Sequence, residues 1–200
     1  MKIYLLDINP TMTQAWKKYF SNIEDVTIIN DDFAHFMITH TDIEAIVSPA
    51  NSYGLMDGGY DKAIIDYFGK ELQYKIQDKI NKEWYGEQPV GTSITVNTDI
   101  SVLNSQKMIR LIHTPSMRSP EIIKDSRIVY QCMRTTLIEA EKQDVRSIVI
   151  PAFGGLCGQI SLDTIAYYMY CAYNQLKEYQ PHIATWKDAI KTKQKLQQRG

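Results

Sequence analysis

The chain has 200 residues, of which 44% are apolar and 22% are charged. This length and composition describe one globular domain with its own core, and they exclude a disordered chain, a collagen and a coiled coil. Lys and Arg number 22 against 23 Asp and Glu, so the net charge of −1 gives no general attraction to nucleic acid or to an anionic membrane. We expect binding to neither, and the sequence leaves the oligomeric state open.

From the N-terminus onward, short apolar runs alternate with longer stretches of helical period. The runs expected to be strands are Lys2–Ile8, Val26–Ile29, Ala45–Val47, Ser93–Val96, Met108–His113 and Ser147–Ile150. The stretches expected to be helices are Thr11–Phe20, Asp61–Trp84, Glu121–Glu141 and Leu162–Tyr179. Gly69 marks a break or a kink inside the second of these. The alternation predicts an α/β domain in which helices cover a six-stranded sheet.

No linker, repeat or low-complexity tract divides the chain. We therefore expect a single domain over residues 1–200, with a core at about 2–179 and a helical extension at 180–200. The last stretch, Lys187–Arg199, is rich in Lys and Gln. This composition is typical of a solvated helix or a frayed end, and a small basic contact surface is the alternative.

The cysteines and the N-terminus indicate where the protein acts. Cys132, Cys157 and Cys171 form no CxxC pair and have no matching His pair, which predicts neither a disulfide framework nor structural zinc. No other cluster has metal-ligand spacing, so we expect no metal and no cofactor. The chain has no signal-peptide core and no apolar run approaching the ~20 residues of a membrane span. We expect a cytoplasmic protein.

The first unusual segment follows the run Ala45–Val47 and precedes a helical stretch. Its glycines permit tight backbone turns, and its Asn and Asp side chains can hydrogen-bond a sugar. The residues concerned are Asn51, Gly54, Asp57, Gly58, Gly59 and Asp61. A simple turn with Asp61 as the helix cap is the alternative. The density of such residues favours a ligand-binding loop.

The second segment, Ile150–Gln159, follows a strand and precedes a helix that Ser161 or Asp163 begins. Gly154, Gly155 and Gly158 expose successive backbone N–H groups, which can bind a diphosphate without any lysine. The segment has neither the Lys-Ser or Lys-Thr of a Walker loop nor the GxGxxG of a dinucleotide site. Tight packing is the alternative reason for the glycines.

Together the two loops resemble the macrodomain family, whose members bind ADP-ribose. Asn51, Gly58, Gly59 and Asp61 are similar to the family's first loop, in which an Asp follows the Asn by ten residues. The resemblance covers about residues 2–179, with Leu111–Pro115 and Ile150–Gly158 in the family's order. It implies a three-layer α/β/α fold with a mixed, mostly parallel sheet, and an ADP-ribose or ADP-ribosylated substrate.

The resemblance also implies roles for individual residues at the nucleotide end. Asp32 accepts a hydrogen bond from the adenine amino group with Phe33 nearby, and Asp31 is the neighbouring candidate. A carboxylate that merely ends a strand is the alternative. The backbone of the second loop cradles the diphosphate, and that loop consists of Gly154, Gly155, Leu156, Cys157 and Gly158.

At the other end of the ligand, the resemblance implies that Asn51 touches the distal ribose. Asp61 lies beside the C1 atom of that ribose and orients a water that hydrolyses the bond there, with Asp57 assisting. Arg118, in a Pro-x-Met-Arg stretch, contacts phosphate or substrate, and an ordinary surface ion pair is its alternative.

Two departures from the family's pattern favour a second hypothesis. Met56 and Asp57 stand where many hydrolytic members have glycines, and Cys157 stands where an aromatic side chain is common. The alternative function is a non-catalytic reader, or a protein that sequesters ADP-ribose or NAD-derived signals. His113 is interpreted as structural, and Cys157 as a small side chain rather than a nucleophile.

Overall fold

Strands and helices alternate along the computed structural model, which describes residues 1–177 and 182–197. In chain order the elements are β1 (Lys2–Leu6), α1 (Pro10–Phe20), β2 (Val26–Ile29), α2 (Phe33–Thr39), β3 (Ala45–Ser48), α3 (Gly59–Phe68), α4 (Glu71–Trp84), β4 (Ile94–Ser101), β5 (Met108–His113), α5 (Ile128–Lys142), β6 (Ser147–Ile150), α6 (Leu162–Lys177) and α7 (Trp186–Gln197). The end of the expected helix Leu162–Tyr179 lies outside the described residues.

The strands form one sheet in the order β2-β1-β6-β3-β5-β4. All neighbours are parallel except β4, which pairs antiparallel with β5 at one edge. The prediction of a mixed, mostly parallel six-stranded sheet is therefore confirmed. Because β1, β2, β3, β5 and β6 run the same way, their carboxyl ends meet at one edge of the sheet, where ligands of open α/β sheets bind.

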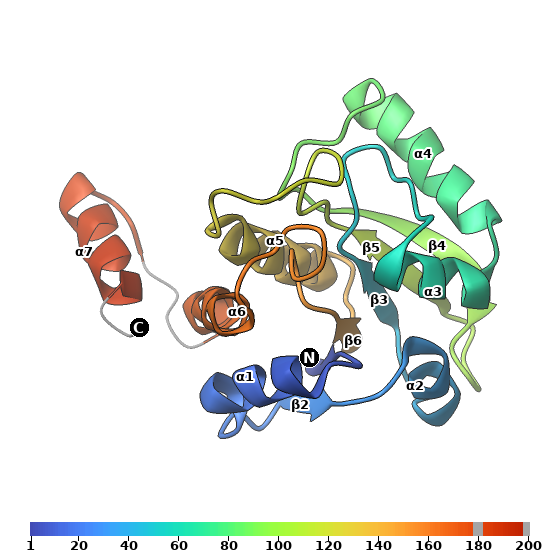
Figure 1. Ribbon diagram of the computed structural model, residues 1–200, viewed down its shortest axis with the longest axis horizontal. Coiled ribbons are helices and arrows are strands. Elements are labelled where there is room, and N and C mark those ends of the chain that lie inside the picture. Colours follow the sequence, from blue (N-terminus) through green and yellow to red (C-terminus); the bar gives the residue numbers. More distant parts are fainter. Residues whose placement is uncertain (178–181, 198–200) are drawn as a thin grey trace.

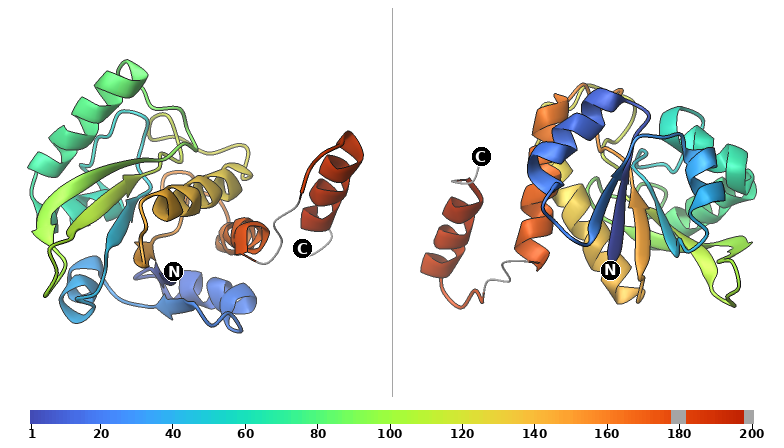
Figure 2. Two further views of the ribbon diagram at one scale, coloured as in Figure 1. Left: turned by 180° about the vertical axis from the view of Figure 1, so that it is seen from behind. Right: turned by 90° about the horizontal axis from the view of Figure 1, so that it is seen from below.

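Helices cover both faces of the sheet, which gives the expected three layers (Figure 1). Alternate strand residues point to opposite faces, so Ile3 and Leu5 join one apolar cluster while Tyr4 and Leu6 join the other. Helices α1, α5 and α6 pack on the first face, and α2, α3 and α4 pack on the second (Figure 2). Burial on both faces explains why the central strands read as continuous apolar runs.

Three expected boundaries are wrong, each for a local reason. The first strand ends at Leu6 rather than Ile8, because Asn9 caps α1 and donates its backbone N–H to Asp7 Oδ1 at 2.8 Å. The edge strand β4 continues to Ser101 because its pairing with β5 outlasts the apolar run. The helix expected from Glu121 begins only at Ile128, where the Asp125 and Ser126 carbonyls accept the first turn's hydrogen bonds.

Gly69 divides the expected helix Asp61–Trp84 into α3 and α4. Its φ of +93° lies outside the helical region, and its N–H closes α3 on the Ile65 carbonyl at 2.7 Å. A further short helix, α2, was not expected at all. Its seven residues lie between Asp32 and Asn51 in the sequence.

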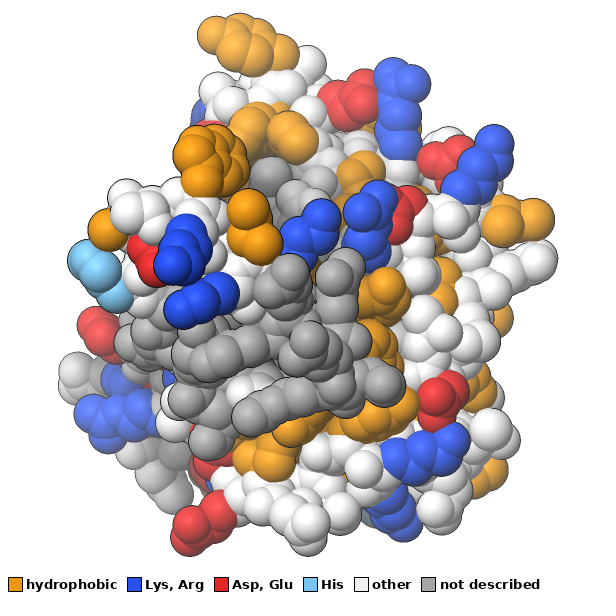
Figure 3. All heavy atoms as spheres, turned by 90° about the vertical axis from the view of Figure 1, so that its left-hand side faces the viewer, with side chains coloured by type: hydrophobic (Ala, Val, Ile, Leu, Met, Phe, Trp, Pro, Cys, Tyr) orange, Lys and Arg blue, Asp and Glu red, His pale blue; other side chains and the backbone are white. Residues whose placement is uncertain are grey.

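Helix α7 stands apart from the three layers, beside α6 (Figures 1 and 2). It occupies the Lys- and Gln-rich stretch expected to be a solvated helix or a frayed end, and Trp186 and Ile190 are exposed on it. On the face that includes α7, basic side chains stand among hydrophobic and acidic ones (Figure 3). Of the helices in the described part of the chain, none has the length and apolar character to span a membrane.

Candidate functional site

The three segments singled out in the sequence all follow parallel strands at the same edge of the sheet. Residues 30–33 follow β2, residues 49–61 follow β3, and residues 151–161 follow β6. Strand β6 lies directly beside β3 and beside β1, so the second and third segments are neighbours in space. This common edge is the candidate site.

Asn51 closes the first loop on itself. Its carboxamide oxygen accepts hydrogen bonds from the backbone N–H groups of Tyr53 (3.1 Å) and Leu55 (3.3 Å), and its amide nitrogen donates to the Leu55 carbonyl at 2.8 Å. Gly54, inside this turn, has a φ of +66°, and a β-carbon there would lie 2.6 Å from Ile76. The turn therefore needs a glycine where α4 passes beneath it.

Asp61 lies in the first turn of α3, but it is not the cap of that helix. The N-cap of α3 is Gly58, so the alternative of Asp61 as the capping residue is wrong. Asp61 is only 8% exposed, whereas Asp57 is exposed on the loop. When ionised, Asp61 places its negative charge at the positive end of the α3 helix dipole. The sequence placed the carboxyl correctly next to the helix start and missed its burial.

Burial makes Asp61 an unusual carboxyl. Desolvation raises its pKa to about 7, the nearby Ser48 hydroxyl opposes the rise, and the charge of Asp57 adds to it. Asp61 Oδ1 is buried without a hydrogen-bond partner. A carboxyl of this kind gains and loses a proton near neutral pH, which suits a general acid or base.

The glycines of the second loop are required by close packing. A β-carbon on Gly154, whose φ is +75°, would lie 2.8 Å from Ile123, and one on Gly158 would lie 2.5 Å from the Gly154 carbonyl oxygen. Ile123 also donates its backbone N–H to the Gly158 carbonyl at 3.0 Å. Close packing, the alternative reason for the glycines, therefore accounts for Gly154 and Gly158. Ile123, in the segment before α5, supports this loop.

The same loop also presents unpaired donors. Backbone N–H groups of residues 155–158 donate no hydrogen bond to any part of the chain that the structure describes. Ser161 then caps α6, its hydroxyl oxygen accepting from the Thr164 N–H at 3.3 Å. Four successive unpaired donors next to a helix start are the groups that an anion-binding nest requires, and we call residues 155–158 the nest. Leu156 and Cys157 are exposed within it.

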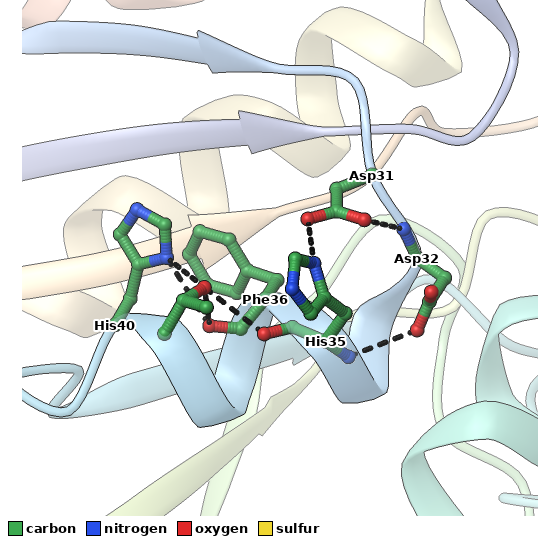
Figure 4. A network of polar contacts seen from close by, with 6 residues as sticks. Asp31, Asp32, His35, Phe36 and His40 are labelled. Carbon is green, nitrogen blue, oxygen red and sulfur yellow. Dashed lines mark hydrogen bonds and ion pairs between the residues drawn. The ribbon is translucent and has the colours of Figure 1, made fainter.

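The aspartates after β2 are engaged at the start of α2 (Figure 4). Asp32 is the N-cap, accepting the His35 N–H at 2.9 Å, and Asp31 accepts the Asp32 N–H and pairs with the His35 ring. This ion pair lowers the pKa of Asp31 and raises that of His35. Phe33 is buried, edge-on against Tyr60 at 5.3 Å between ring centroids, so it anchors α2 to α3.

Arg118 makes an ion pair at the surface. Its guanidinium donates two hydrogen bonds to Glu87, at 2.7 and 2.9 Å, and both side chains are well exposed. Its backbone carbonyl accepts the Ser52 N–H at 3.1 Å, so the residue adjoins the first loop. Arg118 therefore makes the surface ion pair that the sequence left open as the alternative to a phosphate contact. It does so beside the candidate site.

Sequence reasoning missed two polar side chains near Asp61. Ser48, the last residue of β3, is fully buried, and its hydroxyl influences Asp61. Asp7, at the end of β1, is partly buried and adds to the raised pKa of Tyr60, the neighbour of Asp61. The available signal was a polar residue directly at the carboxyl end of an apolar strand, which is where parallel sheets place functional groups.

Comparison with known proteins identifies the family. The Macro domain family matches residues 47–169, which is more than half of the chain, and the chain belongs to that family. A protein of Aquifex aeolicus is 27% identical over 144 residues, covering 72% of this chain and 79% of that one.

Solved structures share the fold. An Oceanobacillus iheyensis macrodomain variant with ADPR has a TM-score of 0.58 at 22% identity, covering 81% of this chain and 89% of that one. The macrodomain of Mycobacterium tuberculosis DarG has a TM-score of 0.55 at 18% identity, covering 68% and 84%. The expected three-layer macrodomain fold is thus confirmed.

Proposed function

We propose that this chain binds ADP-ribose at the carboxyl edge of its sheet and hydrolyses the bond at C1 of the distal ribose. The substrate is a protein, nucleic acid or small molecule that carries ADP-ribose. The observation that carries the proposal is Asp61, a buried carboxyl with a pKa of about 7 placed between the two loops. Three free cysteines, typical of a reducing compartment, support a cytoplasmic setting.

The binding half of the proposal rests on the nest. Four free N–H groups at residues 155–158 can take the two phosphates without a basic side chain, which agrees with the near-neutral charge of the chain. Asp31, Asp32 and Phe33 mark the adenine end of the site after β2, which β1 separates from β6. Macrodomains of the same fold have been solved with ADPR and with ADP, which supports this ligand class.

The catalytic half rests on Asp61 and Asp57. In the ionised form, Asp61 takes a proton from a water that attacks C1, while the departing group leaves with the bonding electrons. Asp57, exposed on the same loop, assists by holding Asp61 near its titration point through charge. Asn51 shapes the loop around the distal ribose through the hydrogen bonds of its amide.

A panel of ADP-ribose adducts tests the reaction. We expect turnover of at least one adduct among acyl-linked, nucleotide-linked and acetyl-linked ADP-ribose. Asp61→Asn, which keeps the shape and removes the base, lowers the rate at least about 100-fold without loss of binding. Asp57→Asn, which changes the exposed carboxyl, is the matched control and lowers the rate of turnover by less than about tenfold. An unchanged rate in Asp61→Asn would show the mechanism to be wrong.

A reader or sequestering protein is the second candidate, and two observations favour it. The amide of Asn51 is engaged on both sides by its own loop, which leaves less of it for substrate. Met56, which by the family resemblance stands where many hydrolytic members have glycines, is buried, in agreement with a fixed loop. Tight ADP-ribose binding with no turnover of any adduct would select this function over hydrolysis.

A further inference from the structure

Several buried polar atoms have no hydrogen-bond partner. In residues 1–177 and 182–197, six buried side-chain atoms are of this kind, and four of them belong to the ends of β3 and β5 and to the first turn of α3. Native proteins leave few such atoms, and each calls for a ligand, a water or a function. The atoms are Ser48 Oγ, Ser52 Oγ, Tyr60 Oη, Asp61 Oδ1, Trp84 Nε1 and His113 Nε2.

Two of these residues are direct neighbours in the sheet. Ser48 ends β3 and is in register with His113, which ends the adjacent parallel strand β5. Two residues earlier on each strand, Ile46 and Leu111 both belong to the apolar cluster under α3 and α4. Since strand side chains repeat every second residue, Ser48 and His113 face this same side, where Asp61 also lies.

The imidazole of His113 has a fixed tautomer. The amide nitrogen of Gln88 donates to the carbonyls of Thr92 and His113, so the amide oxygen must be the acceptor for His113 Nδ1 at 2.7 Å. Nδ1 therefore carries the hydrogen, and Nε2 is a buried acceptor. Burial lowers the pKa of His113 to about 3, so the ring stays neutral.

We propose that the Ser48 hydroxyl is a positioning group that alternates between two acceptors, the Asp61 carboxylate and Nε2 of His113. When Asp61 is ionised, Ser48 donates to the carboxylate. When Asp61 has taken the proton from the attacking water, the carboxyl donates to Ser48 Oγ, and the Ser48 hydrogen turns to Nε2. No bond of Ser48 or His113 breaks, and the proton stays on Asp61 until the departing group takes it.

Other ionisable groups around Asp61 do not substitute for this arrangement. Asp57 faces it from the loop and adds negative charge, which opposes ionisation. Tyr60 lies next to it on α3 with a buried hydroxyl whose pKa is raised well above the ordinary value, with Asp7 of the β1 end adding to the rise. Ionised Asp57 has no hydrogen to donate, and the Tyr60 hydroxyl has no hydrogen-bond partner among the described residues. The Ser48 hydroxyl is the neighbouring group that lowers the pKa of Asp61.

Titration of Asp61 by NMR, with ¹³C-labelled aspartate and Asp61→Asn for assignment, tests the inference on the full chain without ligand. Ser48→Ala removes the donor, and the midpoint is expected to rise by about one pH unit. His113→Phe removes the competing acceptor, so Ser48 donates to Asp61 alone and the midpoint falls. Ser52→Ala, a second buried serine without a partner, is the matched control and leaves the midpoint unchanged.

Opposite shifts in the two variants support the alternation, because a loosened structure would move both midpoints the same way. Equal midpoints in the wild type, Ser48→Ala and Ser52→Ala would overturn the inference, and this comparison decides it if His113→Phe does not fold. The part that Ser48 plays in the reaction rests on the proposed function, whereas its exchange between Asp61 and His113 does not. Failure to bind ADP-ribose would refute that function and leave the titration result standing, so the two failures are distinguishable.

Discussion

Gly59 and Leu156 bring the two loops into contact. A β-carbon on Gly59, at the start of α3, would lie 3.4 Å from Cδ2 of Leu156 in the loop after β6. Gly59 has a φ of +55°, so the chain turns there to present the first turn of α3 to the nest. The start of α3, which holds Asp61, and the loop with the free N–H groups therefore lie side by side.

The buried carboxyl of Asp61 makes stability depend on pH. Its pKa is about 7 in the folded chain and near 3.8 in the unfolded chain, so the folded state binds its proton more tightly. The stabilisation is complete below about pH 4 and is lost as the pH rises to about 7, at about 1.4 kcal/mol for each unit of raised pKa. Urea unfolding of the wild type and Asp61→Asn between pH 4 and 8 measures the difference. A constant difference over this range would contradict the assignment.

The second loop should not tolerate a side chain at Gly158. Gly158→Ala places a methyl group 2.5 Å from the Gly154 carbonyl oxygen and 2.6 Å from Ile123, and we expect a loss of about 1–3 kcal/mol of stability. Gly58→Ser is the matched control, because a β-carbon there meets nothing within 4 Å and serine is a favoured N-cap residue at the start of α3. Thermal melting of both variants checks this. Equal melting temperatures would mean that the loop adapts freely.

Asp32 should show separable roles in folding and in binding. Asp32→Ala removes the N-cap of α2 and is expected to cost about 1 kcal/mol, whereas Asp32→Asn keeps a capping side chain and stays close to wild type. Calorimetry on the Asn variant then reports the contribution of the charge to ADP-ribose binding alone. Equal stability of all three proteins would show that the cap is unimportant.

Arg118 and Glu87 form an exposed pair, so neither Arg118→Ala nor Glu87→Ala should change stability by more than about 1 kcal/mol. The family resemblance suggests that Arg118 contacts a phosphate. If it does, loss of that contact weakens ADP-ribose binding in Arg118→Ala but not in Glu87→Ala. Equal affinities of both variants and the wild type would remove Arg118 from the site.

Much of the fold follows from local patterns, and the departures have local causes. Apolar runs bounded by turn residues predict all six strands, because parallel strands are buried on both faces. Helix α2 is missed because its seven residues show too little periodicity, and its cap at Asp32 reads equally well as a strand end. The stretch after Glu121 has helical spacing, yet Ile123 is used to pack against Gly158 instead.

For the site, the spacing of Asn51, Gly58, Gly59 and Asp61 predicts the loop and its location. Sequence spacing does not reveal the burial of Asp61, since that depends on how α3 packs against β3 in the folded chain. Nor does it pair Ser48 with His113, because register across strands is set by the whole sheet. The sequence signal for Ser48 and His113 is that each is a polar residue at the end of an apolar strand.

ADP-ribose is expected to bind at this edge of the sheet. Calorimetric titration of the purified chain with ADP-ribose, with AMP and ribose 5-phosphate as controls, tests it most directly. We expect binding in the micromolar range for ADP-ribose and much weaker binding for either fragment, because only the whole ligand spans Asp32, the nest and Asp61. No detectable heat together with no thermal shift would contradict it.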